Sequence, residues 1–154
     1  MLSASFAKLA GVKQGRVKIS AAAEADYLAD VALAANFSDL LARAESAEAE
    51  FRQAQATGAP ASVQYPLARN LDVALTDVTR SAYAAQRAEI GPRGYDDRLF
   101  RRASKAKPAV HAWTDEAERL LTLRETHRLT GFPARPEAQA LGAEIARLPG
   151  NTHA

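Results

Sequence analysis

The sequence predicts an all-α protein, and three observations support this. The 154 residues are rich in alanine and other strong helix formers along almost their whole length. Apolar residues recur at helical spacing between regularly placed Gly and Pro breakers. No alternating run of Val, Ile and aromatic residues, and no Asn-Gly or Asp-Gly pair, indicates a strand or a hairpin. We therefore expect a short N-terminal helical pair followed by a multi-helix body.

Caps and breakers place the individual helices. Ser20, Ser38 and Asn70 are suitable N-caps, and Gly11, Gly58 and Gly91-Pro92 are suitable stops. In chain order these signals predict helices over residues 3–10, 13–19, 21–35, 39–56, 71–89, 96–104, 114–130 and 136–148.

Three features justify the later part of this assignment. Leu71, Leu75 and Val78 continue with Ala82 and Ala85 as an amphipathic stripe. Acidic residues follow Thr114, and basic residues precede Gly131, which matches both ends of a helix dipole. Pro136 opens the last helix, whose apolar side carries Leu141, Ile145 and Leu148, and Pro149-Gly150 ends it.

The helices group into four parts along the chain. Residues 1–20 form the paired-helix module, and residues 21–57 an acidic helical segment. Two prolines and a glycine between 58 and 66 predict a linker over 58–69, followed by a helical body over 70–154. Because aromatic residues make up only 6% of the chain, we expect a thin core that depends on self-association, and hence a homo-oligomer.

Charge is unevenly distributed, although the net charge is only +2. The first twenty residues contain four basic residues and no acidic one, whereas residues 21–57 contain seven acidic residues against Arg43 and Arg52. Residues 91–110 are basic again. Such an asymmetry points to charged partners and says nothing about the fold.

Several classes of protein are disfavoured by what the sequence lacks. It contains no cysteine, which excludes disulfides and thiol nucleophiles, and no apolar run approaches the ~18 residues that span a bilayer. No phosphate-binding Gly-rich loop, Ser/His/Asp set or nucleophile elbow is present. We expect a non-enzymatic protein without cofactor, soluble in the cytoplasm, or in the host cytoplasm or virion if it is encoded by a phage.

The opening stretch SASFAKLAGVKQGRVK is the most specific functional signal. Two crossed short helices require a small residue in the first helix, a glycine at the turn and a β-branched residue in the second. Ala7, Gly11 and Val17 have this spacing, and Phe6 and Val12 are apolar as the packing requires.

FAKLAGVKQGRVK resembles the helix-turn-helix superfamily of DNA-binding proteins, over about a tenth of the chain. The resemblance implies that the second helix enters the major groove of double-stranded DNA. Gln14 and Arg16 would then read base edges, while Lys13 and Lys18 would contact phosphates. The frayed start of an alanine-rich helical protein is the alternative interpretation.

The whole layout is similar to that of small subunits of phage terminases. In that family an N-terminal helix-turn-helix recognises the packaging site, a helical middle assembles a ring, and the C-terminal segment engages the large ATPase subunit. The likeness beyond the motif is one of layout alone, and a repressor with a helical dimerisation body has the same outline. A helical structural or adaptor protein of a virion or another assembly, binding protein rather than DNA, is the second hypothesis.

A second basic cluster has two interpretations. It contains Arg98, Arg101, Arg102, Lys105 and Lys107, with Tyr95 and Phe100 interleaved. The cluster is suited to bind phosphates and to stack on bases, or to meet the acidic helices of a neighbouring subunit. Self-association is slightly favoured.

Two further features have ordinary explanations. Trp113 is expected to be an anchor in the core or an interface. His111, Asp115 and Glu118 can share a helix face, but a closed zinc site needs more nitrogen or sulfur ligands, so we predict no metal.

Overall fold

The computed structural model describes residues 18–133, and within this range all regular structure is helical. The all-α prediction is confirmed for this part of the chain. The helices predicted over 3–10 and 136–148 lie outside the described residues, as does most of the helix predicted over 13–19. Its last two residues, Lys18 and Ile19, are described and are not helical. The elements are α1 (Ala21–Ala34), α2 (Phe37–Ala56), α3 (Ala61–Ile90), α4 (Arg93–Asp96), α5 (Arg98–Ser104), α6 (Pro108–Thr126) and a π-helical turn, η1 (His127–Gly131).

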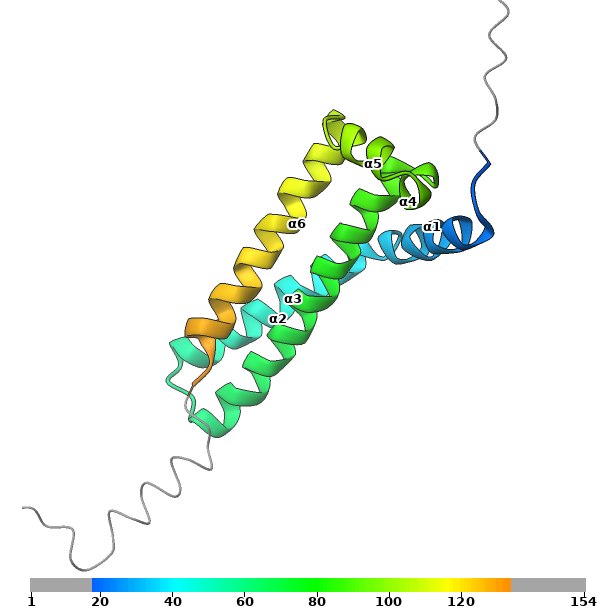
Figure 1. Cartoon of the computed structure of the whole chain (residues 1–154). Coiled ribbons are helices and arrows are strands. Elements are labelled where there is room, and N and C mark those ends of the chain that lie inside the picture. The colour runs from blue at the N-terminus through cyan, green and yellow to red at the C-terminus, as the bar shows by residue number, and fades with distance from the viewer. Residues whose placement is uncertain (1–17, 134–154) are drawn as a thin grey trace, which may run out of the picture.

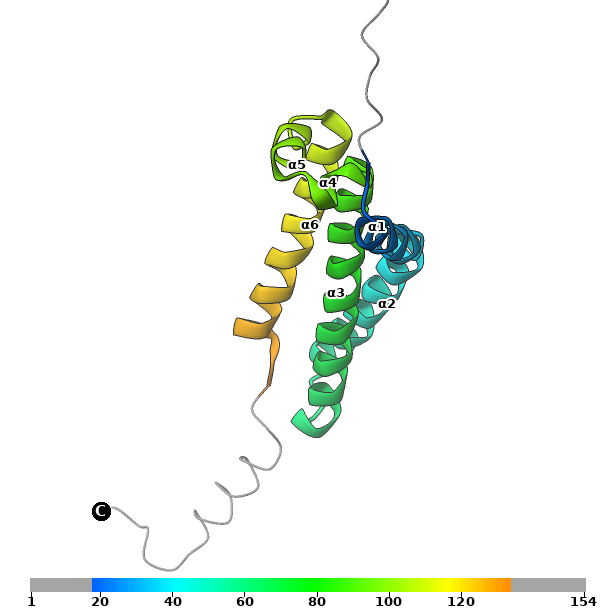
Figure 2. The ribbon, with the colours of Figure 1, turned by 45° about the vertical axis from the view of Figure 1, so that its right-hand side comes forward.

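The 30-residue helix α3 is the centre of the molecule, because α1, α2 and α6 each pack against it. α3 and α6 run side by side, and α2 crosses α3 at an angle (Figure 1). α4 and α5 connect α3 to α6 at one end of this bundle. A turned view shows α1 nearly end-on, lying across α3 close to α4 (Figure 2).

Small side chains dominate the core. The residues of α3 that face its neighbours include Ala68, Ala74, Ala82 and Ala84, and the largest fully buried side chains are Leu120, Val78, Val110 and Ser81. Small residues let helix backbones approach closely but bury little apolar area each. The prediction of a thin core is therefore confirmed.

The predicted linker over 58–69 is wrong for most of its length. Gly58, at φ 64°, ends α2 as expected, but α3 begins at Ala61 rather than at Leu71. Pro60 sits at the N-cap, where its missing N–H costs nothing, and Pro66 removes only one hydrogen bond near the start of a long helix. Tertiary packing compensates, because Ala68 is fully buried and Leu67 packs against the core.

The start of α6 was also predicted six residues too late. Pro108 occupies the first helical position, for which its fixed φ is suited, so it opens the helix instead of marking a loop. Ser38 does not cap α2, which begins at Phe37 behind Asn36. Ser20 does cap α1, since its Oγ accepts a hydrogen bond from the Ala23 N–H at 3.1 Å. Trp113 is a packing anchor. Its ring packs edge-on against the ring of Phe37, with 5.0 Å between the two ring centroids.

Candidate nucleic-acid interface

The α4–α5 end of the bundle carries the second basic cluster on a sharply folded connection. Gly91, at φ 91°, ends α3 in a conformation that side chains disfavour, and α4 turns back against α3. A Cβ at Gly94 would clash with the Ile90 Cγ2, so any other residue there would force Ile90 to shift. Asp97 then caps α5 by accepting from the Phe100 N–H at 2.8 Å.

A hydrogen-bonded network ties this connection to α1 and α3. Arg87 donates two hydrogen bonds to the Asp30 carboxylate, both of 2.7 Å, and the Tyr95 hydroxyl donates to the same carboxylate. Burial acts to raise the pKa of Asp30, but the hydrogen bonds from Arg87 and Tyr95 outweigh it and lower this pKa. Burial and the bond to Asp30 both raise the pKa of Tyr95. The network therefore holds Asp30 ionised and Tyr95 neutral, with α1, α3 and α4 joined.

A second contact fixes the point at which the N-terminal segment joins the body. The Asp96 carboxylate accepts from the Ser20 N–H at 2.7 Å and from the Ser20 Oγ–H at 2.8 Å. Asp96 is the last residue of α4, directly before the cap of α5. Lys18 is exposed two residues before Ser20, so the described chain begins at the end of the bundle that carries α5.

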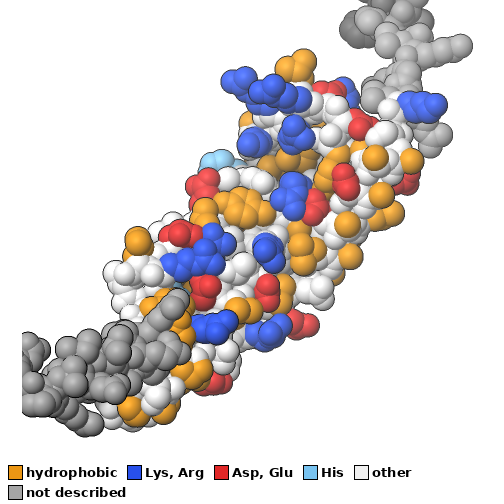
Figure 3. All heavy atoms as spheres, turned by 60° about the horizontal axis from the view of Figure 1, so that its bottom comes forward, with side chains coloured by type: hydrophobic (Ala, Val, Ile, Leu, Met, Phe, Trp, Pro, Cys, Tyr) orange, Lys and Arg blue, Asp and Glu red, His pale blue; other side chains and the backbone are white. Residues whose placement is uncertain are grey.

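The five basic residues of the second cluster are all solvent-exposed: Arg98, Arg101, Arg102, Lys105 and Lys107. None of them forms an ion pair with an acidic residue of 18–133. Lys and Arg side chains crowd this end of the molecule, whereas basic and acidic side chains are mixed along the rest of the same face (Figure 3). We call these five residues the α5 basic patch.

The aromatic residues within the patch are already engaged. The Phe100 ring lies beneath two cations, with the Arg93 guanidinium carbon 4.5 Å and the Lys107 Nζ 5.2 Å from its centroid. Tyr95 packs edge-on against Tyr27 and bonds to Asp30. The Tyr95 ring is therefore part of the network that positions α4.

The patch is a surface rather than a pocket. The hollow beneath it, lined by Arg87, Ile90, Gly94, Tyr95 and Arg101, holds about 20 Å³, room for about one water molecule. An exposed, unpaired cationic surface of this kind suits an extended polyanion better than a small anionic ligand, which needs a concave site.

The structure places the predicted site residues as follows. Lys13, Gln14 and Arg16 lie outside the described residues, and Lys18 is exposed at the α5 end. The α5 basic patch was predicted from the sequence, and so was Ser20 as a helix cap. The contact of Ser20 with Asp96 and the pairing of Asp30 with Arg87, which position the patch, were not predicted. No sequence signal joins these residues, since Ser20 and Asp96 are 76 positions apart.

The remaining candidates form no site in the described part of the chain. The His111 Nδ1 lies 2.9 Å from an Asp115 carboxylate oxygen, and both side chains are mostly exposed. Among residues 18–133, no three His, Cys, Asp or Glu side chains are placed to hold a metal ion. Over the same range no helix has the length and apolar character to cross a membrane.

Comparison of the chain with known protein families, curated proteins and solved structures finds no match.

Proposed function

We propose that this protein is a non-enzymatic DNA-binding protein with two basic elements at one end of a helical body. The first element is the helix-turn-helix-like segment with Lys13, Gln14, Arg16 and Lys18, and the second is the α5 basic patch. The observation that supports the proposal is the pair of hydrogen bonds from Ser20 to Asp96, because they hold Ser20, the second residue after Lys18, next to the start of α5.

The two elements have complementary chemistry. Gln and Arg side chains pair with adenine and guanine edges in the major groove, and so provide sequence specificity. Exposed Arg and Lys side chains on α5 contact phosphates without reading sequence, and so provide affinity and orientation. The proposed role is that of a phage packaging factor, similar in layout to terminase small subunits, or of a regulatory factor with the same outline.

A mobility-shift titration of duplex DNA at several salt concentrations tests the proposal. Gln14→Ala with Arg16→Ala removes the base-reading residues, and we expect it to weaken binding to a preferred duplex more than to random duplex. Replacing Arg98, Arg102 and Lys105 by Gln removes three of the five charges of the patch, and we expect weaker binding to both. Each lost phosphate contact lowers the slope of log K against log salt by about 0.9.

A matched triple variant controls for the loss of net charge. Arg43, Arg69 and Arg80 are also exposed and form no ion pair among the described residues, but they lie on α2 and α3 away from α5. Their replacement by Gln removes the same charge and is expected to leave the salt slope unchanged. If the wild-type protein shifts no duplex at low salt, the proposal fails.

A helical structural or adaptor role is the second candidate, and the exposed apolar side chains favour it. Leu99 is 80% exposed within the α5 basic patch, and Leu28, Val31 and Leu33 are exposed on α1. Exposed apolar groups next to charges are typical of protein interfaces. α1 and α2 are acidic, so they complement the α5 basic patch of a second copy. Light scattering after size exclusion measures this association, and Leu99→Glu with Arg102→Glu is expected to shift it toward the monomer.

A further inference from the structure

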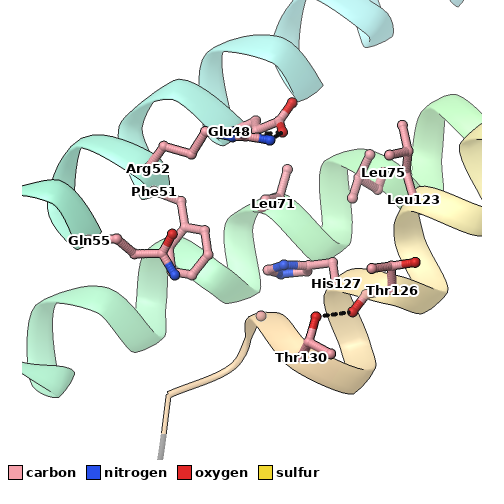
Figure 4. A pocket seen from close by; sticks show the side chains of 11 residues that line it. Glu48, Phe51, Arg52, Gln55, Leu71, Leu75, Leu123, Thr126, His127 and Thr130 are labelled. Carbon is pink, nitrogen blue, oxygen red and sulfur yellow. Dashed lines mark hydrogen bonds and ion pairs between the residues drawn. The ribbon is translucent and has the colours of Figure 1, made fainter.

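A groove lies between α2 and α6 at the end of the bundle opposite α5. Its floor is Leu71 and Leu75 of α3, and its walls are Phe51 of α2 with Leu123 and His127 of α6 and η1. It holds about 320 Å³ and is mostly apolar, with the ion-paired Glu48 and Arg52 on its rim. Phe51 and His127 point toward each other across its lower part (Figure 4).

The lower wall is rigidly built. The His127 ring is buried, with its Nε2 bonded to the Ala68 carbonyl at 2.8 Å, and it lies between Phe51 and Phe132. A Cβ on Gly131 would clash with the His127 Nδ1, so glycine at this position lets η1 close over the ring. His127 is therefore a wall of this groove.

Within the described residues, 18–133, the upper wall of the groove is partly exposed to solvent. Leu120 is 1% exposed, but Leu123, in the next turn of α6, is 42% exposed over the groove. Covering such a wall with apolar side chains is favourable because it removes apolar surface from water.

The chain itself supplies an occupant of the right length and pattern. Gly131 lines the groove, and the described chain ends two residues later at Pro133. Residues 134–154 lie outside the described residues, and their sequence predicts a helix over 136–148 with Leu141, Ile145 and Leu148 on one side. The four residues from Phe132 to Arg135 are a usual length for a connection between antiparallel helices.

We infer that residues 136–148 dock as a helix into the α2–α6 groove of their own chain. Thirteen helical residues extend about 20 Å, enough to run from Gly131 back past Leu123. Antiparallel packing on α6 then places Ile145 about level with Leu123. The docked segment packs against α3 as a fourth long helix beside α1, α2 and α6. It fills the groove, so a helix of a partner protein could not bind there. This inference does not depend on DNA binding, which is proposed for the other end.

Paired cysteines in the full-length chain test the docking, since the native sequence contains none. Leu123→Cys with Ile145→Cys is treated with a short bis-maleimide, and crosslinked monomer is measured by gel mobility and mass spectrometry. The control pair joins Leu123→Cys to Ala143→Cys, because position 143 lies on the opposite side of the predicted helix. Docking predicts that the first pair crosslinks at least about tenfold faster within one chain, at a rate independent of protein concentration.

A second measurement uses Leu123→Cys alone and the rate of its reaction with a maleimide dye. Adding Ile145→Asp should release the segment and raise this rate about tenfold, whereas adding Ala143→Asp should not. Equal rates in both backgrounds, or equal crosslinking of the two cysteine pairs, would overturn the inference. Crosslinks found only between two chains would also overturn it, because the occupant would then be a second copy.

Discussion

The contact between Ser20 and Asp96 leads to a prediction about local stability. Asp96→Ala removes two hydrogen bonds of 2.7 and 2.8 Å that hold the start of α1 against α4. Both bonds end on a carboxylate, but both are exposed to water, so we expect each to contribute about 0.5–1 kcal/mol. Their loss should lower the free energy needed to open the first turn of α1 by about 1–2 kcal/mol.

The effect should remain local, because other contacts still join α1 to α3. The Ser81 Oγ–H donates to the Leu33 carbonyl at 2.9 Å, and Arg87 keeps its two bonds to Asp30. We therefore expect the unfolding midpoint in denaturant to change little. The Asp96→Ala variant should open mainly between Ser20 and Glu24.

Native-state hydrogen exchange measures this opening residue by residue. The amides of Ala23 and Glu24 bond to the Ser20 Oγ and carbonyl, at 3.1 and 3.0 Å, so their exchange reports on the first turn. A change of about 1–2 kcal/mol corresponds to exchange that is about 5–30-fold faster. Asp26→Ala removes an exposed carboxylate of the same helix and should leave both amides unchanged. Exchange at the wild-type rate in Asp96→Ala would refute the anchoring of the start of α1 against α4.

Three other substitutions test the packing and the buried network. Gly131→Ala forces its Cβ against the His127 ring, and thermal melting should show a loss of about 1–3 kcal/mol, whereas Thr130→Ala next to it should cost far less. Leu120→Ala should cost about 2–5 kcal/mol in denaturant unfolding because the side chain is 1% exposed, and Leu129→Ala, at 84% exposed, should stay within about 0.5 kcal/mol. The raised pKa of Tyr95 means that its stabilisation is complete below pH 10, the ordinary pKa of tyrosine, and declines above it. Tyr95→Phe should therefore be less stable than wild type at pH 8 and should lose less stability between pH 10 and pH 11. If wild type and Tyr95→Phe lost the same free energy of unfolding between pH 10 and pH 11, the stabilising role of Tyr95 would be contradicted.

The fold class was predictable because helical periodicity and capping are local properties. Ser20 as a cap and Gly58 and Gly91 as stops required only their immediate neighbours. The starts of α3 and α6 were not predictable in this way. Pro66 and Pro108 read as breakers in isolation, but packing of Ala68 and Val110 in the core keeps both segments helical.

The candidate interface was predictable only in part, for a related reason. Exposed basic residues cluster in sequence, so the α5 basic patch was visible as a run of Arg and Lys. Its supports were not, because Asp30 meets Arg87 and Tyr95 across 57 and 65 positions. The burial of His127 was not predictable either, because it depends on Phe51 and Ala68, which no local pattern connects to it.

The small residues of α3 set how this sequence can change over evolution. Ala82 and Ala84 are fully buried where neighbouring helices pack closely, and Ser81 must also reach the Leu33 carbonyl. Larger side chains there would push whole helices apart, so substitutions at these sites should be restricted to residues of similar size. Surface charges such as those of α5 can be exchanged or moved at little cost to the fold. Distant relatives should therefore be recognised by the spacing of small residues along one 30-residue helix rather than by their basic residues.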